Sequence, residues 1–219
     1  MAHQAISRTR QSVGEEIANS ISHGVGLLGA LAAVPALIGA ALRRSDPPDL
    51  VGVSVFATTL VLLYLASTLY HALPSPRAKP VLRVLDHGAV YLLIAGTYTP
   101  FALGPLRGPW GSLLFALVWS LAVLGVVVTA LGGLRYPRLT TGAYLALGWL
   151  GVLVIRVLWV RVPLAGLAWL FAGGLAYTVG VVFLTARRMR YGHFVWHLFV
   201  LAGTSCHVVA VLYYAAQGS

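Results

Sequence analysis

Residues 192–216 read GHFVWHLFVLAGTSCHVVAVLYYAA, twenty-five residues without Asp, Glu, Lys or Arg. An α-helix needs about 20 mainly apolar residues to cross the ~30 Å hydrocarbon core of a bilayer. Strands of a membrane β-barrel are about half as long and alternate between apolar and polar positions, and this stretch does not alternate. We therefore predict a membrane-spanning helix here, with the histidines at positions 193 and 197 on its first turns.

Six further apolar runs precede this one and have similar lengths. They cover residues 19–42, 50–71, 84–103, 110–134, 139–159 and 164–186. Proline, glycine and arginine gather in the short gaps between them, as expected of turns between helices. The sequence thus predicts an all-α, seven-transmembrane-helix bundle over residues 19–216. A short polar segment, residues 1–18, precedes it.

The composition agrees with a membrane protein. The chain is 59% hydrophobic and 9% charged, with a mean hydropathy of +0.86, whereas soluble domains carry about 25% charged residues. Its net charge of +10 comes without a basic patch interleaved with exposed aromatic residues, so we expect membrane lipids rather than nucleic acid as partners. No obligatory protein partner is evident. The single cysteine, Cys206, excludes an intramolecular disulfide.

The basic residues predict an orientation. Seven crossings place ten of the fifteen Lys and Arg residues on the side of the N-terminus and five on the other side. The ten are Arg8, Arg10, Arg77, Lys79, Arg83, Arg135, Arg138, Arg187, Arg188 and Arg190. Cytoplasmic loops are enriched in such residues, so we expect a cytoplasmic N-terminus, an external C-terminus and a location in the inner (plasma) membrane.

The same count places several ionisable residues together at the cytoplasmic ends of their helices. His71 ends the second run, Asp86 begins the third, and His193 and His197 begin the seventh. Ionisable groups are costly in lipid and usually mark a functional site there. His207 lies ten residues beyond His197, about 15 Å along the helix, and cannot bind the same ion.

This combination of residue types is typical of a metal site. Histidines at i and i+4 present two imidazoles on one helix face, and His71 supplies a third. A catalytic zinc ion takes three protein ligands and keeps one position for water, although the ligand type also suits iron, cobalt or nickel.

Asp86 and Ser67 are the candidate catalytic side chains. Asp86 could act as general base on a bound water or orient an imidazole, and Ser67 lies one turn before His71 on the same helix face. Alternatives remain open at this stage. Asp86 could pair with Arg83 or cap the third helix, and Ser67 could bond to its own helix backbone.

Four more residues are candidates for supporting the metal ligands. Glu16, Asn19 and His23 follow one helical stripe, and His87 is next to Asp86. The stripe is interpreted either as a charged entry to the first helix, with the glutamate favoured by the helix dipole, or as a cover beside the metal. His23 and His87 could equally be packed, hydrogen-bonded core residues.

These motifs resemble those of a known family. Glu16-x-x-Asn19-x-x-x-His23, Ser67-x-x-x-His71 followed by Asp86, and His193-x-x-x-His197 resemble the three motifs of the progestin and adipoQ receptor (PAQR) family. The surrounding stretches NSISHGVG, STLYHAL and LDHGAVYLLIAGTYTPF resemble its bacterial branch, the hemolysin III proteins. The match runs from about residue 15 to 214, and alkaline ceramidases look like more distant relatives.

The resemblance implies seven helices, an inner N-terminus and an intramembrane zinc ion ligated by His71, His193 and His197. It also implies that Asp86 contacts the zinc-bound water with Ser67 nearby, and that the reaction is hydrolysis of a lipid amide, as in ceramide cleavage. The chain lacks the long polar N-terminal domain of the receptor members, so hormone sensing is not expected.

Three hypotheses follow. The first is a zinc-dependent hydrolase of a membrane lipid amide or ester. The second is a non-enzymatic protein with structural zinc that acts in membrane homeostasis, sensing or cytolysis, and a closed four-ligand site completed by Asp86 or His87 would favour it. The third, a transporter or proton relay, requires polar groups along the whole path, and the sequence favours it least.

Overall fold

The computed structural model describes residues 11–44, 47–186 and 188–215. Residues 1–10 of the predicted polar segment lie outside the described part. The first helix begins at Val13, earlier than the predicted boundary at residue 19, and so takes in the end of that segment.

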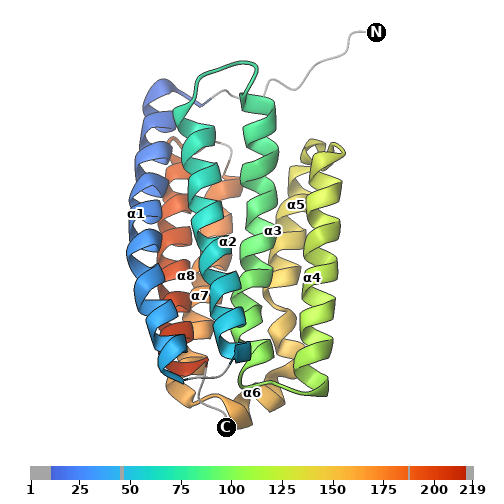
Figure 1. Ribbon diagram of the computed structural model, residues 1–219. Coiled ribbons are helices and arrows are strands. Elements are labelled where there is room, and N and C mark those ends of the chain that lie inside the picture. Colours follow the sequence, from blue (N-terminus) through green and yellow to red (C-terminus); the bar gives the residue numbers. More distant parts are fainter. Residues whose placement is uncertain (1–10, 45–46, 187, 216–219) are drawn as a thin grey trace.

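Helices make up the fold, and no strand occurs among the described residues. The elements are α1 (Val13–Arg44), α2 (Pro47–Ala72), α3 (Lys79–Leu103), α4 (Pro109–Ala130), η1 (Gly133–Arg135), α5 (Pro137–Gly148), η2 (Leu150–Val154), α6 (Ile155–Arg161), α7 (Leu164–Thr185) and α8 (Gly192–Tyr214). Consecutive long helices run in opposite directions, so α3, α5 and α8 begin at the end of the bundle where α1 begins (Figure 1).

Within the described part of the chain, six segments are long and apolar enough to cross a membrane. They are Val13–Arg43, Asp49–Ala72, Pro109–Ala130, Pro137–Arg161, Leu164–Thr185 and Gly192–Tyr214. Large apolar side chains such as Leu124 and Val182 are exposed on their outer faces, as expected of surfaces that face lipid. The remaining long helix, α3, carries Asp86 and lies between α2 and α4 (Figure 1).

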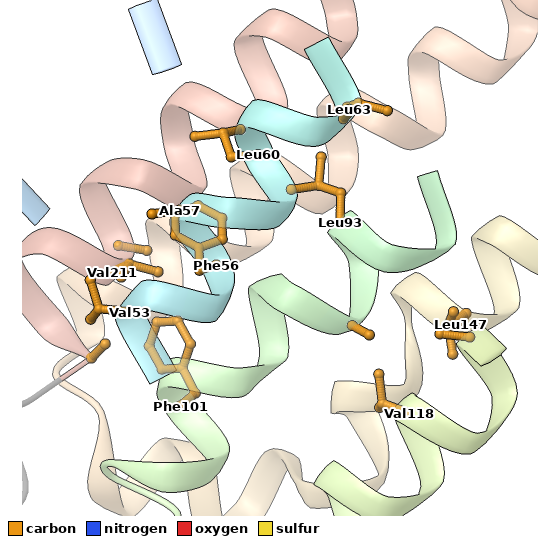
Figure 2. Close-up of a cluster of buried hydrophobic side chains, with 14 of the residues drawn as sticks. Val53, Phe56, Ala57, Leu60, Leu63, Leu93, Phe101, Val118, Leu147 and Val211 are labelled. Carbon is orange, nitrogen blue, oxygen red and sulfur yellow. The ribbon is translucent and has the colours of Figure 1, made fainter. Parts of the chain in front are cut away.

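The core joins α2 and α3 closely. Phe56, Leu60 and Leu63 of α2 lie with Leu93 and Phe101 of α3 in one buried cluster (Figure 2). A small residue makes this approach feasible, because a Cβ atom added at Gly96 of α3 would overlap the Thr59 side chain of α2. Small residues are the usual means of close helix contact in membranes, where lipid leaves little hydrophobic drive for association.

The fifth predicted helix, 139–159, is not continuous. It is divided into α5, the 3₁₀ segment η2 and α6. The Tyr98 hydroxyl from α3 donates to the carbonyls at 147 and 148 and accepts from the backbone N–H of Gly151 (3.0 Å). Backbone groups freed in a membrane must find partners within the protein, and this one side chain supplies them, so the helix can break here.

Candidate metal centre

Three histidines converge at the end of the bundle where α8 begins. His71 lies in the last turn of α2, and His193 and His197 occupy one face of the first two turns of α8. One ring nitrogen from each lies within 4.8 Å of the other two. His71 and His197 are buried and His193 is half-buried. The structure therefore brings together the three residues that the sequence predicts as ligands.

Each of the two buried imidazole rings is fixed by a hydrogen bond at its Nδ1 atom. Nδ1 of His71 lies 2.8 Å from Oε2 of Glu16, whose other oxygen accepts from Lys79 Nζ at 3.1 Å. Nδ1 of His197 lies 3.2 Å from the backbone carbonyl of Asn19 and 3.0 Å from Ser22 Oγ. A hydrogen bond at one nitrogen, to a carboxylate or carbonyl, fixes the ring and leaves the other nitrogen as a lone-pair donor, which is the usual arrangement of a metal-ligating histidine.

The second nitrogens fit a bound cation. Nε2 of His71 and Nε2 of His193 are buried, and neither has a hydrogen-bond partner among the described residues. A buried polar atom without a partner is destabilising, and a metal ion between the rings would satisfy these atoms. Three imidazole nitrogens are a donor set that zinc and other first-row metals accept.

Asp86 and Ser67 lie close to this centre without joining it. Both are buried, with exposed fractions of 8% and 1%. α3 begins at Lys79, so Asp86 lies two turns inside the helix and the alternative of an N-cap is wrong. Among the described residues, Ser67 Oγ makes no hydrogen bond to its own helix, which removes the backbone-bonding alternative. Asp86 is not in the three-histidine group.

The four supporting candidates divide into two sets. Glu16 and Asn19 contact the ligands directly, and His23 stacks on His197 with ring centroids 3.5 Å apart and planes 9° from parallel. His87 points elsewhere: its Nδ1 bonds to the Arg83 carbonyl at 3.0 Å and lies 3.4 Å from Asp86 Oδ2. The stripe on α1 thus covers the centre, and His87 lies outside it.

Sequence reasoning missed two contributors, Ser22 and Lys79. Ser22 donates its hydroxyl to the Asn19 carbonyl at 2.8 Å and thereby presents its oxygen to His197. Its spacing of three from Asn19 places it on the stripe, so the periodicity alone could have found it. Lys79 had no such signal, because it is the first residue of α3 and its contact with Glu16 joins two helices far apart in the sequence. His207 bonds to the Leu170 carbonyl at 3.3 Å and lies outside the histidine group, as predicted.

A cavity of about 580 Å³ reaches the centre from within the bundle. His23, Ser67, Asp86 and His197 contribute to its wall, and most of the rest is apolar. Its lining extends along α3 from Asp86 to Phe101, fifteen residues or about 22 Å of helix. The site is therefore a set of potential metal ligands at one end of a long apolar chamber, which from here on we call the metal cavity.

Comparison with known proteins places this arrangement in a family. The sequence model of the Haemolysin-III related family matches residues 11–208. The chain belongs to the Haemolysin-III related family. It is 40% identical over 206 residues to the Hemolysin-3 homolog of Bacillus subtilis (strain 168), covering 94% of this chain and 97% of that one.

Two further relatives widen the comparison. Hemolysin-3 of Bacillus cereus is 39% identical over 211 residues, 96% of each chain. The human Monocyte to macrophage differentiation factor is 28% identical over 227 residues, 98% of this chain and 91% of that one. Together with the six apolar helices, these matches make the Haemolysin-III related chain a multi-pass integral membrane protein, and a bacterial plasma membrane fits.

Proposed function

We propose that this protein is a zinc-dependent hydrolase that cleaves an amide or ester bond of a membrane lipid. The observation that carries the proposal is the metal cavity, because a long apolar chamber reaches His197 of the three converging histidines together with a buried carboxylate and a buried hydroxyl. Enzyme sites that bind apolar ligands are typically chambers of this size with a few polar groups at one point.

Zinc held by His71, His193 and His197 would supply an activated water and polarise a carbonyl oxygen. Asp86 then accepts a proton from the attacking water and returns it to the nitrogen or oxygen of the leaving group, as a general base that becomes a general acid. Ser67 donates a hydrogen bond to the substrate carbonyl. The apolar wall of the metal cavity holds the acyl chain and excludes bulk water from the reacting bond.

The ligand count supports catalysis over a structural role. A structural zinc site is normally closed by four protein ligands, whereas a catalytic site keeps one position open. Among the described residues, neither Asp86 nor His87 joins the three histidines. The proposal includes seven crossings, with α3, which lies between α2 and α4, as one of them, and a cytoplasmic N-terminus.

The test is hydrolysis by the purified protein in lipid nanodiscs that contain a ceramide or a matched ester lipid, with released fatty acid measured by mass spectrometry. We expect Asp86→Asn to keep the metal and to lower turnover by about 10²-fold or more, since general acid–base catalysis contributes roughly that much. The matched control is Asp49→Asn, which removes a buried carboxylate at the opposite end of the bundle and should leave turnover unchanged.

Two results would contradict the proposal or a part of it. If the wild-type protein with its full metal content releases no more fatty acid than His71→Ala on either substrate class, the hydrolase proposal is wrong. If Asp86→Asn retains full turnover, the role of Asp86 is wrong, although the hydrolase remains.

A further inference from the structure

A second cavity, of about 780 Å³, lies at the same end of the bundle as the histidines but on the side of α5. α3, α5, the end of α7 and the segment leading to α8 contribute to its wall. Arg83, Arg138 and Arg188 line it, and no Asp or Glu is among the described lining residues. We call this space the arginine cavity.

Three guanidinium groups around one concavity favour an anionic occupant. Arg83 comes from α3, Arg138 from the first turn of α5 and Arg188 from the segment before α8, so the positive charge converges from three separate elements. Guanidinium groups bind phosphate oxygens in a bidentate manner, which makes arginine the usual residue for this purpose.

Most of the other polar groups of the wall already have hydrogen-bond partners. The hydroxyls of Thr140, Thr141 and Thr185 donate to backbone carbonyls of their own helices, and His87 Nδ1 lies 3.0 Å from the Arg83 carbonyl. The Asp86 carboxylate belongs to the wall of the metal cavity and does not line this one. Recognition of an anion would therefore come mainly from Arg138 and Arg188, and Arg83 adds to the positive charge of the wall.

The apolar part of the wall points to a lipid rather than a free anion. Leu134, Leu184 and Met189 line the cavity beside the arginines. Two large apolar side chains close in sequence to lining residues are strongly exposed: Leu131, three residues before Leu134, at 83%, and Leu139, directly after Arg138, at 69%. A phosphate held by the arginines would have these apolar surfaces along its attached chains, and basic pockets between membrane helices are known to suit anionic headgroups.

We propose that the arginine cavity binds the phosphate headgroup of an anionic phospholipid, which bridges α3, α5 and the α7–α8 connection. This binding site is separate from the three histidines and does not require the proposed hydrolase function. Its occupant would tie the short, interrupted α5–α6 passage to the rest of the bundle.

The experiment measures lipid retention by native mass spectrometry on the full chain, with phosphatidylglycerol, phosphatidylcholine and soluble glycerol phosphate as probes. We expect the double variant Arg138→Gln/Arg188→Gln to weaken phosphatidylglycerol binding by roughly tenfold or more, because charge-assisted bidentate contacts are lost. Arg135→Gln/Arg190→Gln is the matched control. It removes the same charge at the same end of the bundle from residues that do not line the cavity, and it should bind as the wild type does.

Both exchanged arginines of the test variant are exposed, so the fold is expected to persist, and an unchanged melting temperature without added lipid would verify this. Equal losses in the test and control variants would reduce the effect to general surface charge and overturn the proposal. Equal binding of phosphatidylglycerol and phosphatidylcholine, or full competition by glycerol phosphate, would also overturn it. Equal binding of the two lipids would show no preference for an anionic lipid. Full competition by glycerol phosphate would show that the ligand is a free phosphate.

Discussion

Glu16 shows how one residue on α1 can control a metal site built on α2 and α8. Its carboxylate bonds to His71 at 2.8 Å and to Lys79 at 3.1 Å. It therefore fixes the His71 ring and pairs with the charge of the first residue of α3. The neighbouring residue, Glu15, instead accepts from the backbone N–H groups of Ser12 and Tyr191. Of these adjacent glutamates, Glu16 thus supports a metal ligand, whereas Glu15 bonds to the backbone.

We predict that Glu16→Gln lowers metal affinity by about 10- to 100-fold, the usual effect of losing a carboxylate behind a ligating histidine. Competition with a chelating dye on the purified protein measures the affinity. Glu15→Gln provides the comparison, since it makes the same chemical change one residue away and should stay within about threefold of wild type, the ordinary context-dependent spread for a group outside the ligand shell. Equal losses in both variants would contradict the assignment.

Much of this residue-level arrangement could be predicted from the sequence. The count of membrane crossings predicted that His71 and Asp86 lie at the same end of the bundle as His193. The period of an α-helix predicted that Glu16, Asn19 and His23 share one helix face. The orientation of each ring could not be predicted, because it depends on hydrogen bonds between helices far apart in the chain. The stacking of His23 on His197 is an example, since no local rule pairs residues 174 positions apart.

At the scale of elements, contact between α2 and α3 sets the position of His71 relative to Asp86. Gly96 allows the contact, because a larger residue would overlap Thr59. Helix boundaries were predicted less well than helix existence. α1 begins before residue 19, and the fifth helix is broken where Tyr98 satisfies the backbone of Gly151. Hydropathy cannot detect such a break, because the interrupted segment is as apolar as a continuous one.

We predict that Gly96→Ala destabilises the protein by about 1–3 kcal/mol, the usual cost of overpacking a tight interface. Thermal unfolding in detergent measures the change. Gly29→Ala is the control, because a Cβ atom there meets nothing within 4 Å and alanine favours a helix by up to about 1 kcal/mol over glycine. A Gly96→Ala melting temperature equal to or above that of Gly29→Ala would show that α2 and α3 do not meet as described.

At the scale of the whole molecule, the two cavities share one end of the bundle. Tyr144 lines both, and its hydroxyl donates to the His87 carbonyl at 2.8 Å. The distribution of basic residues predicts that this end faces the cytoplasm. The basic residues that favour this orientation would then include the arginines that line the arginine cavity.

Labelling of single cysteines tests the orientation. In a Cys206→Ser background, we predict that Arg107→Cys reacts with a membrane-impermeant maleimide in intact cells, and that Arg77→Cys reacts only after the membrane is opened. Arg107 lies between α3 and α4, and Arg77 lies between α2 and α3, so the two positions are at opposite ends of the bundle. The reverse pattern would invert the topology, and labelling of both in intact cells would contradict a bundle that spans the membrane.

The central claim is that histidines from α2 and α8 hold one metal ion together. Elemental analysis of the protein purified in a membrane mimetic tests it most directly, with His71→Ala, His193→Ala and His207→Gln beside the wild type. We predict about one zinc ion per chain for the wild type and for His207→Gln, and loss of the metal in the other two, since a three-histidine site cannot hold its ion with one ligand removed. Wild-type protein without stoichiometric metal, or His71→Ala with its metal retained, would contradict the claim.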